Sequence, residues 1–161
     1  IEPVTVKHHP VDDFSQDMWL EIEYRAPTYV RPMADGFEFT SPLMQVVLHH
    51  RNLFGTGGTR WAEDRETDLL LWYTQLLDGS ETIKIPGGYD LIDPPESEEV
   101  DEIYAYFSGT TEQKGSKLVL DHRAEIRRRQ IPPDGYSGFQ KAMAAAREWG
   151  ETVYRLEKGG K

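Results

Sequence analysis

The chain has 161 residues and a mass of 18.5 kDa, a size typical of one domain or of a domain with a modest appendage. It carries 18 Lys and Arg against 28 Asp and Glu, and the resulting net charge of −10 disfavours nucleic acid and anionic membranes as partners. It has no cysteine, which excludes disulfides, thiolate metal sites and cysteine nucleophiles.

Nothing in the chain predicts insertion into a membrane. No apolar run approaches the roughly 20 residues that a membrane-spanning helix needs. Residues 1–7 contain neither the basic region nor the apolar region of a secretory signal peptide. Because the chain begins at Ile1 rather than Met, we interpret it as processed or cut from a longer protein.

The N-terminal half predicts strands separated by turns. Residues 1–17 are expected to form a lead-in strand, at residues 4–7, and a linker. Residues 18–25 then alternate, with Met18, Leu20, Ile22 and Tyr24 on one face, which predicts a half-buried antiparallel strand. Further strands are predicted at residues 28–31, 36–39, 44–50, 82–85, 89–92, 103–108, 117–123 and 125–131.

Two segments in the middle of the chain do not alternate between apolar and polar residues. Residues 69–77 are apolar on both parities, which predicts a central strand covered on both sides, although a short buried helix has the same pattern. The turn residues Asp78 and Gly79 are expected to end this strand. The acidic stretch at residues 96–102 predicts a solvated loop.

A helical pattern occurs only near the C-terminus. Apolar side chains recur at helical spacing over residues 136–149, which are also rich in Ala, and Gly150 is a natural stop. The proline-containing stretch 131–135 predicts the turn that enters the helix. Residues 152–157 alternate as a last strand, and residues 159–161 are expected to be a frayed tail.

Together these segments predict an all-β fold. Many short strands without βαβ alternation favour an antiparallel, immunoglobulin-like β-sandwich over a parallel sheet. We expect one such domain at residues 18–158, with a single C-terminal amphipathic α-helix that covers an otherwise open sheet face or edge. The side chains expected to seat the helix are Tyr136, Phe139, Met143 and Trp149.

The histidines and glycines do not predict a metal or phosphate site. The five histidines are His8, His9, His49, His50 and His122. Neighbouring residues on a strand point to opposite faces, so each adjacent pair offers one ligand per face, and no metal and no cofactor are expected. The glycine-rich stretch 55–59 lacks the Gly-Lys-Ser/Thr ending of a phosphate-binding loop, which favours a flexible loop.

Two sets of side chains could still bind or react. Trp61 lies in a charged, turn-like segment, and Tyr104 and Tyr106 are predicted to share one strand face, so these three aromatic residues are candidate contacts for a sugar or a protein. Glu21 and Glu23 should lie roughly 6 to 7 Å apart, a separation used by carboxylate pairs in glycosidases. With His122 they form the alternative of a carboxylate- and histidine-dependent hydrolase.

Several motifs carry a family resemblance. They include Ile-Lys-Ile-Pro-Gly-Gly-Tyr at residues 83–89, Pro-Pro-Glu at residues 94–96, and Ile-Pro-Pro-Asp-Gly-Tyr at residues 131–136 before the Ala-rich helix. In this order, with residues 24–30 and 35–42 upstream, they resemble the C-terminal β-sandwich of bacterial transglutaminase-like proteins. These are envelope proteins in which an N-terminal β domain precedes a transglutaminase-type core.

The resemblance implies an accessory role. The family's Cys-His-Asp triad lies in the core domain, and a chain without cysteine cannot supply it, so no catalytic residue is carried over. The implied function is a non-catalytic domain of a larger periplasmic or cell-surface protein, with other domains of the parent chain, a protein or a glycan as partners. The alternatives left open are a free-standing carbohydrate- or protein-binding module and the hydrolase described above.

Overall fold

The structure is a computed structural model that describes residues 2–27, 29–44 and 65–159. Its helices are α1 (Pro42–Met44) and α2 (Pro133–Gly150). Its strands are β1 (Glu2–His8), β2 (Leu20–Arg25), β3 (Arg31–Pro32), β4 (Gly36–Thr40), β5 (Leu69–Leu70), β6 (Gln75–Lys84), β7 (Tyr89–Ile92), β8 (Glu98–Asp101), β9 (Ala105–Lys114), β10 (Lys117–Ile126), β11 (Gln130–Ile131) and β12 (Val153–Lys158).

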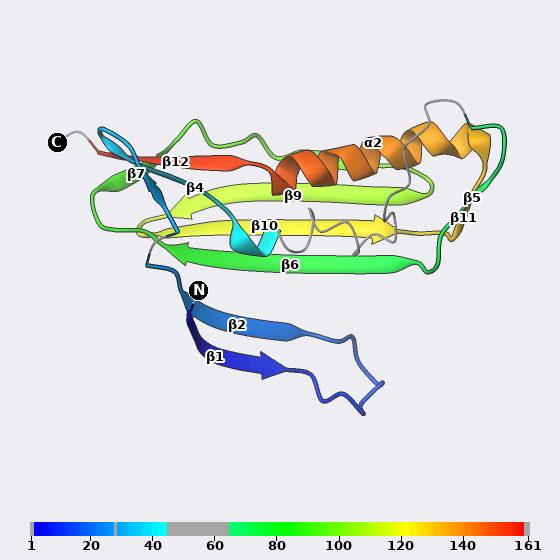
Figure 1. Cartoon of the computed structure of the whole chain (residues 1–161), viewed down its shortest axis with the longest axis horizontal. Helices are drawn as coiled ribbons and strands as arrows, with labels where there is room; N and C mark the ends of the chain where they lie inside the picture. Colours follow the sequence, from blue (N-terminus) through cyan, green and yellow to red (C-terminus); the bar gives the residue numbers. More distant parts are fainter. Residues whose placement is uncertain (1, 28, 45–64, 160–161) are drawn as a thin grey trace.

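Two antiparallel sheets and α2 form the body of the molecule (Figure 1). The larger sheet has the strand order β6-β10-β9-β8, and the smaller has the order β3-β4-β12-β7. One face of the larger sheet contacts α2, chiefly through β9, and the Tyr154 hydroxyl of β12 reaches Thr111 of β9 at 3.4 Å. The predicted all-β class with a C-terminal helix is therefore confirmed, and the helix and the smaller sheet share one layer.

The core lies between these layers. Along β10, every second side chain from Leu118 to Ile126 is buried, and the same alternation holds at the start of β9. From the other layer, Phe39 of β4 stacks on Tyr154 of β12, with ring centroids 5.6 Å apart. The side chains predicted to seat α2 are all buried, which confirms that prediction: Tyr136, Phe139, Met143 and Trp149.

One cross-strand row of the larger sheet contains two glycines. His122 of β10 is directly opposite Gly79 of β6 and Gly109 of β9. A Cβ atom on Gly79 would come within 2.5 Å of the His122 ring, and one on Gly109 within 2.4 Å of Trp149 Cε2. Since no side chain occupies either position, the two rings lie directly on the strand backbone.

Two predictions for residues 69–79 are wrong. The segment 69–77 is not one central strand, because β5 ends at Leu70 and β6 begins at Gln75, with Leu70 and Trp72 exposed. Gly79 does not end the strand either, since β6 continues through it to Lys84. A strand tolerates glycine there because the His122 ring fills the missing side-chain volume.

Other boundaries also differ from the predictions. The acidic stretch is not wholly a loop, because Val100 is buried and anchors β8 beside Phe107 of β9. Residues 117–126 form one strand instead of two, and of the described residues of segment 28–31 only Arg31 is in a strand. Helix α2 begins at Pro133, inside the predicted entry turn, because a proline at the first helical position lacks only a donor that would be unpaired anyway. Most of segment 44–50 lies outside the described residues, and Met44 itself is in α1.

Candidate functional site

Of the three aromatic residues predicted as contacts, the two that the structure describes, Tyr104 and Tyr106, do not share one face. Trp61 lies outside the described residues. Tyr104 precedes β9 and lies against α2, where a Cβ atom on Gly135 would come within 2.1 Å of its ring. Tyr106 alternates with Phe107, which contacts Trp149 of α2, so Tyr106 points to the opposite side of the sheet. The prediction of a shared face is wrong because the chain bends just before β9 begins.

A shallow groove of about 280 Å³ lies beside Tyr104. Its walls come from the first turns of α2 and from residues 102–104. Lys141 Nζ and Glu102 Oε1 lie 3.4 Å apart in it, so its two best-placed opposite charges already pair with each other. The charges of Lys141 and Glu102 are therefore already paired within the chain and are not free for a ligand.

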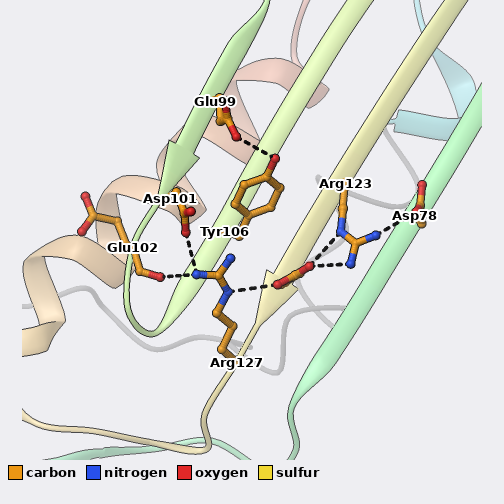
Figure 2. Close-up of polar contacts among 8 residues, drawn as sticks. Asp78, Glu99, Asp101, Glu102, Tyr106, Arg123 and Arg127 are labelled. Atoms are coloured by element: carbon orange, nitrogen blue, oxygen red, sulfur yellow. Dashed lines mark hydrogen bonds and ion pairs between the residues drawn. The ribbon is translucent and has the colours of Figure 1, made fainter.

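The outer face of the larger sheet carries a ladder of ion pairs (Figure 2). Arg123 donates to Glu125 at 2.7 Å and to Asp78 at 3.2 Å. Arg127 donates to the other oxygen of Glu125 at 3.0 Å and to Asp101 at 2.6 Å. The ladder thus links β6, β10 and β8 across the sheet.

Tyr106 belongs to this ladder. Its hydroxyl donates to Glu99 at 3.1 Å, and the Arg127 guanidinium lies 5.3 Å from the centre of its ring. The hydrogen bonds from Arg127 and Arg123 lower the pKa of the Glu125 carboxyl. Because positive and negative groups alternate along it, the ladder is compensated and Tyr106 has contacts within its own chain.

The three residues of the hydrolase alternative do not form an arrangement that could support catalysis. Glu21 and Glu23 do lie on one face of β2, as predicted, but both are exposed, and Glu21 accepts from Lys7 at 2.6 Å. His122 instead lies in the core of the larger sheet, with 3% of its surface exposed. The structure does not bring these three side chains together.

His122 has an unusual environment for a histidine. Neither ring nitrogen has a hydrogen-bond partner among the described residues, and the same holds for the buried indole nitrogen of Trp149. Burial lowers the pKa of His122, and the nearby carboxylates of Asp78 and Asp121 oppose that shift only in part. Burial in this position therefore favours the neutral form of the imidazole over its protonated form.

A second buried polar group ties the N-terminal strands to the body. Glu81 of β6 faces inward and accepts hydrogen bonds from the hydroxyls of Tyr24 in β2 and Ser41 beside α1. The Ser41 hydroxyl oxygen in turn accepts from the Met44 amide at 3.0 Å. Burial and the adjoining Glu81 carboxylate raise the pKa of the Tyr24 phenol. The sequence patterns above do not predict a role for Glu81, although its position on the inward-facing side of β6 is a usable signal.

The β1–β2 hairpin presents an uncovered apolar face. Val6 is directly opposite Ile22, and Leu20 lies two residues along on the same side; we call these three residues the hairpin face. Leu20 is 64% exposed, and the other two side chains are about half exposed. The predicted alternation holds for residues 20–25, although Met18 precedes β2. The predicted half-burial is wrong, because only Tyr24 of this face is partly buried and reaches the body.

Comparison with known protein families finds one that matches most of the chain. Residues 42–151 match the family described as a domain of unknown function with a solved structure (DUF3858), and the chain belongs to that family. No protein in a search of curated proteins matches the chain. The β1–β2 hairpin therefore precedes the part of the chain that matches the family.

One solved structure similar to this chain has a comparable fold. It is the crystal structure of a "putative protease" from Parabacteroides distasonis, with 14% sequence identity and a TM-score of 0.53. The match covers 60% of this chain but only 19% of the other, so the shared fold is a small part of a longer protein there. Within the described part of our chain, neither helix is long and apolar enough to cross a membrane.

Proposed function

We propose that this chain is a non-catalytic interaction domain of a larger, exported transglutaminase-like protein, in which it positions the catalytic core. Membership of the family and a similar fold within a longer chain support this context. The family resemblance described above supports the transglutaminase-type core and a location in the periplasm or at the cell surface.

The hairpin face is the observation that carries the proposal. A two-stranded hairpin is at best marginally stable in water unless an apolar face packs against something else. Here the apolar face is exposed, while the opposite face carries polar side chains such as Lys7 and Glu21. A contiguous exposed apolar surface of this kind is typical of an interface, and the core domain of the parent chain is the partner we assign to it.

The Tyr24–Glu81 hydrogen bond fits this role. It connects the body to the hairpin near one end, so the rest of the hairpin face stays free to meet another domain. A fixed hairpin loses less conformational freedom when a partner docks than a loose one, which favours binding.

Two measurements test the proposal. The complete open reading frame should contain a signal peptide and a cysteine-containing transglutaminase-type core upstream; a short frame starting just before Ile1 would overturn it. Hydrogen exchange of the β2 amides should then be at least about tenfold slower in the full-length protein than in this chain alone, because a docked core protects them.

A matched pair of variants sharpens the second measurement. Leu20→Asp on the hairpin face should abolish the added protection, whereas Ile103→Asp, at a site with 73% exposure beside α2, should leave it intact. Equal exchange in the full-length protein and in the isolated chain would refute docking of the hairpin. Binding of a glycan by the isolated chain, without any core, would favour the free-standing module instead.

A further inference from the structure

Two chain segments pass each other at the end of the molecule where β5 pairs with β11 (Figure 1). Gln75 pairs with Ile126 at one side of this crossing, and Leu70 pairs with Gln130 at the other. Between these points the Leu71 amide donates to the carbonyl of Arg129 at 2.7 Å, and the Arg129 Nε donates back to the Leu71 carbonyl at 3.2 Å. Residues 127–129 therefore lie alongside residues 71–74.

The first segment exposes large apolar side chains. Trp72 is 82% exposed and Leu70 is 72% exposed. Leu71, which lies between them, and Leu69, which precedes them, are both buried. Leu76, at the start of β6, is about half exposed. Because the buried leucines hold this backbone in place, the exposed Trp72 is presented on a fixed support, and Trp is the residue type most enriched at interface hot spots.

The second segment supplies positive charge. Arg127 is already compensated by Glu125 and Asp101. Arg128 is exposed and has no ion pair among the described residues, and Arg129 donates only to a backbone carbonyl there. The neighbouring Asp68 carboxylate is hydrogen-bonded by Gln130. Although the chain has a net charge of −10, Arg128 and Arg129 thus have no ion-pair partner among the described residues.

A shallow groove continues the surface. It has a volume of about 360 Å³ and is lined by residues 74–76 and 125–127. The Oε1 of Gln75 in its wall has no hydrogen-bond partner among the described residues. An amide oxygen left without a donor is costly, and a peptide N–H could supply one after a turn of the Gln75 amide.

We propose that Leu70, Trp72, Leu76, Arg128 and Arg129, which we call the corner surface, bind an extended acidic polypeptide segment that carries an apolar side chain. The apolar side chain of the segment packs on Trp72, and the exposed Leu70 and Leu76 precede and follow Trp72 along the chain. Carboxylates of the segment pair with Arg128 and Arg129, and bidentate pairing makes arginine well suited to this. The leucines favour a polypeptide over a sugar, which stacks on aromatic rings.

The corner surface is distinct from the hairpin face. None of its residues belongs to β1 or β2, so this proposal does not depend on docking of the hairpin. A domain with two such surfaces can hold one partner in place while it binds another.

The test is a selection from a random 12-residue peptide library on phage, with this chain as the target. Enriched peptides should combine Asp or Glu with Leu or an aromatic residue. Their binding, measured by isothermal titration calorimetry, should weaken about tenfold or more with Trp72→Ala. Arg128→Glu should weaken it similarly, and raising the salt concentration should weaken binding to the wild-type chain.

Matched controls isolate the surface. Lys117→Glu makes the same change in charge at the opposite end of β10 and should leave binding unchanged. Melting temperatures of all variants should match the wild type, since each site is exposed. The proposal is overturned if no peptide is enriched, if the enriched peptides are basic, or if Trp72→Ala binds as well as wild type. Binding of polygalacturonate at the same surface without any peptide would reassign it to an acidic glycan.

Discussion

His122 makes the stability of this domain depend on pH. The residue is 3% exposed, and its ring lies on Gly79 and has no hydrogen-bond partner for either nitrogen among the described residues. Protonation would place a charge in this site, and the carboxylates of Asp78 and Asp121 offset the effect of burial on its pKa only in part. We therefore expect acid to destabilise the fold through this side chain.

The sign and size follow from proton linkage. The pKa of His122 is lower in the folded state than its ordinary value of about 6.5, so the unfolded chain binds the proton more readily. The contribution to stability is complete above that value and is lost as the pH falls from about 6.5 toward the folded pKa. For one proton, the loss approaches about 1.4 kcal/mol for each pH unit below 6.5.

Urea unfolding at several pH values measures this effect. The free energy of unfolding of the wild type should fall more between pH 7.5 and 5.5 than that of His122→Leu, by at most about 1.4 kcal/mol. The comparison uses the slopes with pH, so any constant cost of the substitution cancels. Leu120→Val, which changes the same buried face of β10 without removing a titratable group, should keep the wild-type slope. Parallel curves for wild type and His122→Leu would refute the argument.

Two further changes probe the packing and the buried carboxylate. Phe139→Ala should lower the free energy of unfolding by roughly 3 to 5 kcal/mol in a urea titration, because Phe139 has no exposed surface; a melt like that of wild type would show that α2 is not docked as described. Tyr24→Phe removes a hydrogen bond to the buried Glu81 and should cost about 1.5 to 3 kcal/mol by the same measurement. Tyr106→Phe, which loses a hydroxyl bonded to the exposed Glu99, should cost less than about 1 kcal/mol, and equal costs for the two tyrosines would contradict this account.

Local sequence patterns predicted the helices and strands more accurately than they predicted which faces of those elements are buried. The spacing of Tyr136, Phe139 and Met143 predicted both the helix and its buried face, because helical periodicity is a property of the local sequence. Alternation likewise predicted which side chains of β2 share a face. Whether that face is covered depends on what lies opposite it, so the exposure of Leu20 could not be predicted from β2 itself.

The candidate surfaces show the same division. The apolar pattern of residues 69–77 predicts a buried strand, but Trp72 is exposed because the strand is interrupted between β5 and β6. An apolar run looks the same in sequence whether or not such an interruption occurs. The Arg127 guanidinium above the Tyr106 ring comes from the residue that follows β10, and the Glu99 carboxylate comes from β8 on the other side of β9. Their juxtaposition required the strand order of the larger sheet.

The absence of cysteine, the acidic charge, the all-β class and the C-terminal helix are all determined by the sequence itself, because composition and short-range periodicity depend only on neighbouring residues. Tertiary structure alone decided that Gly79, His122 and Gly109 form one row and that Tyr24 meets Glu81. Those contacts depend on strand register and on layer packing, where residues far apart in the chain compete for the same volume. The exposed hairpin face and the corner surface are likewise what this packing leaves uncovered.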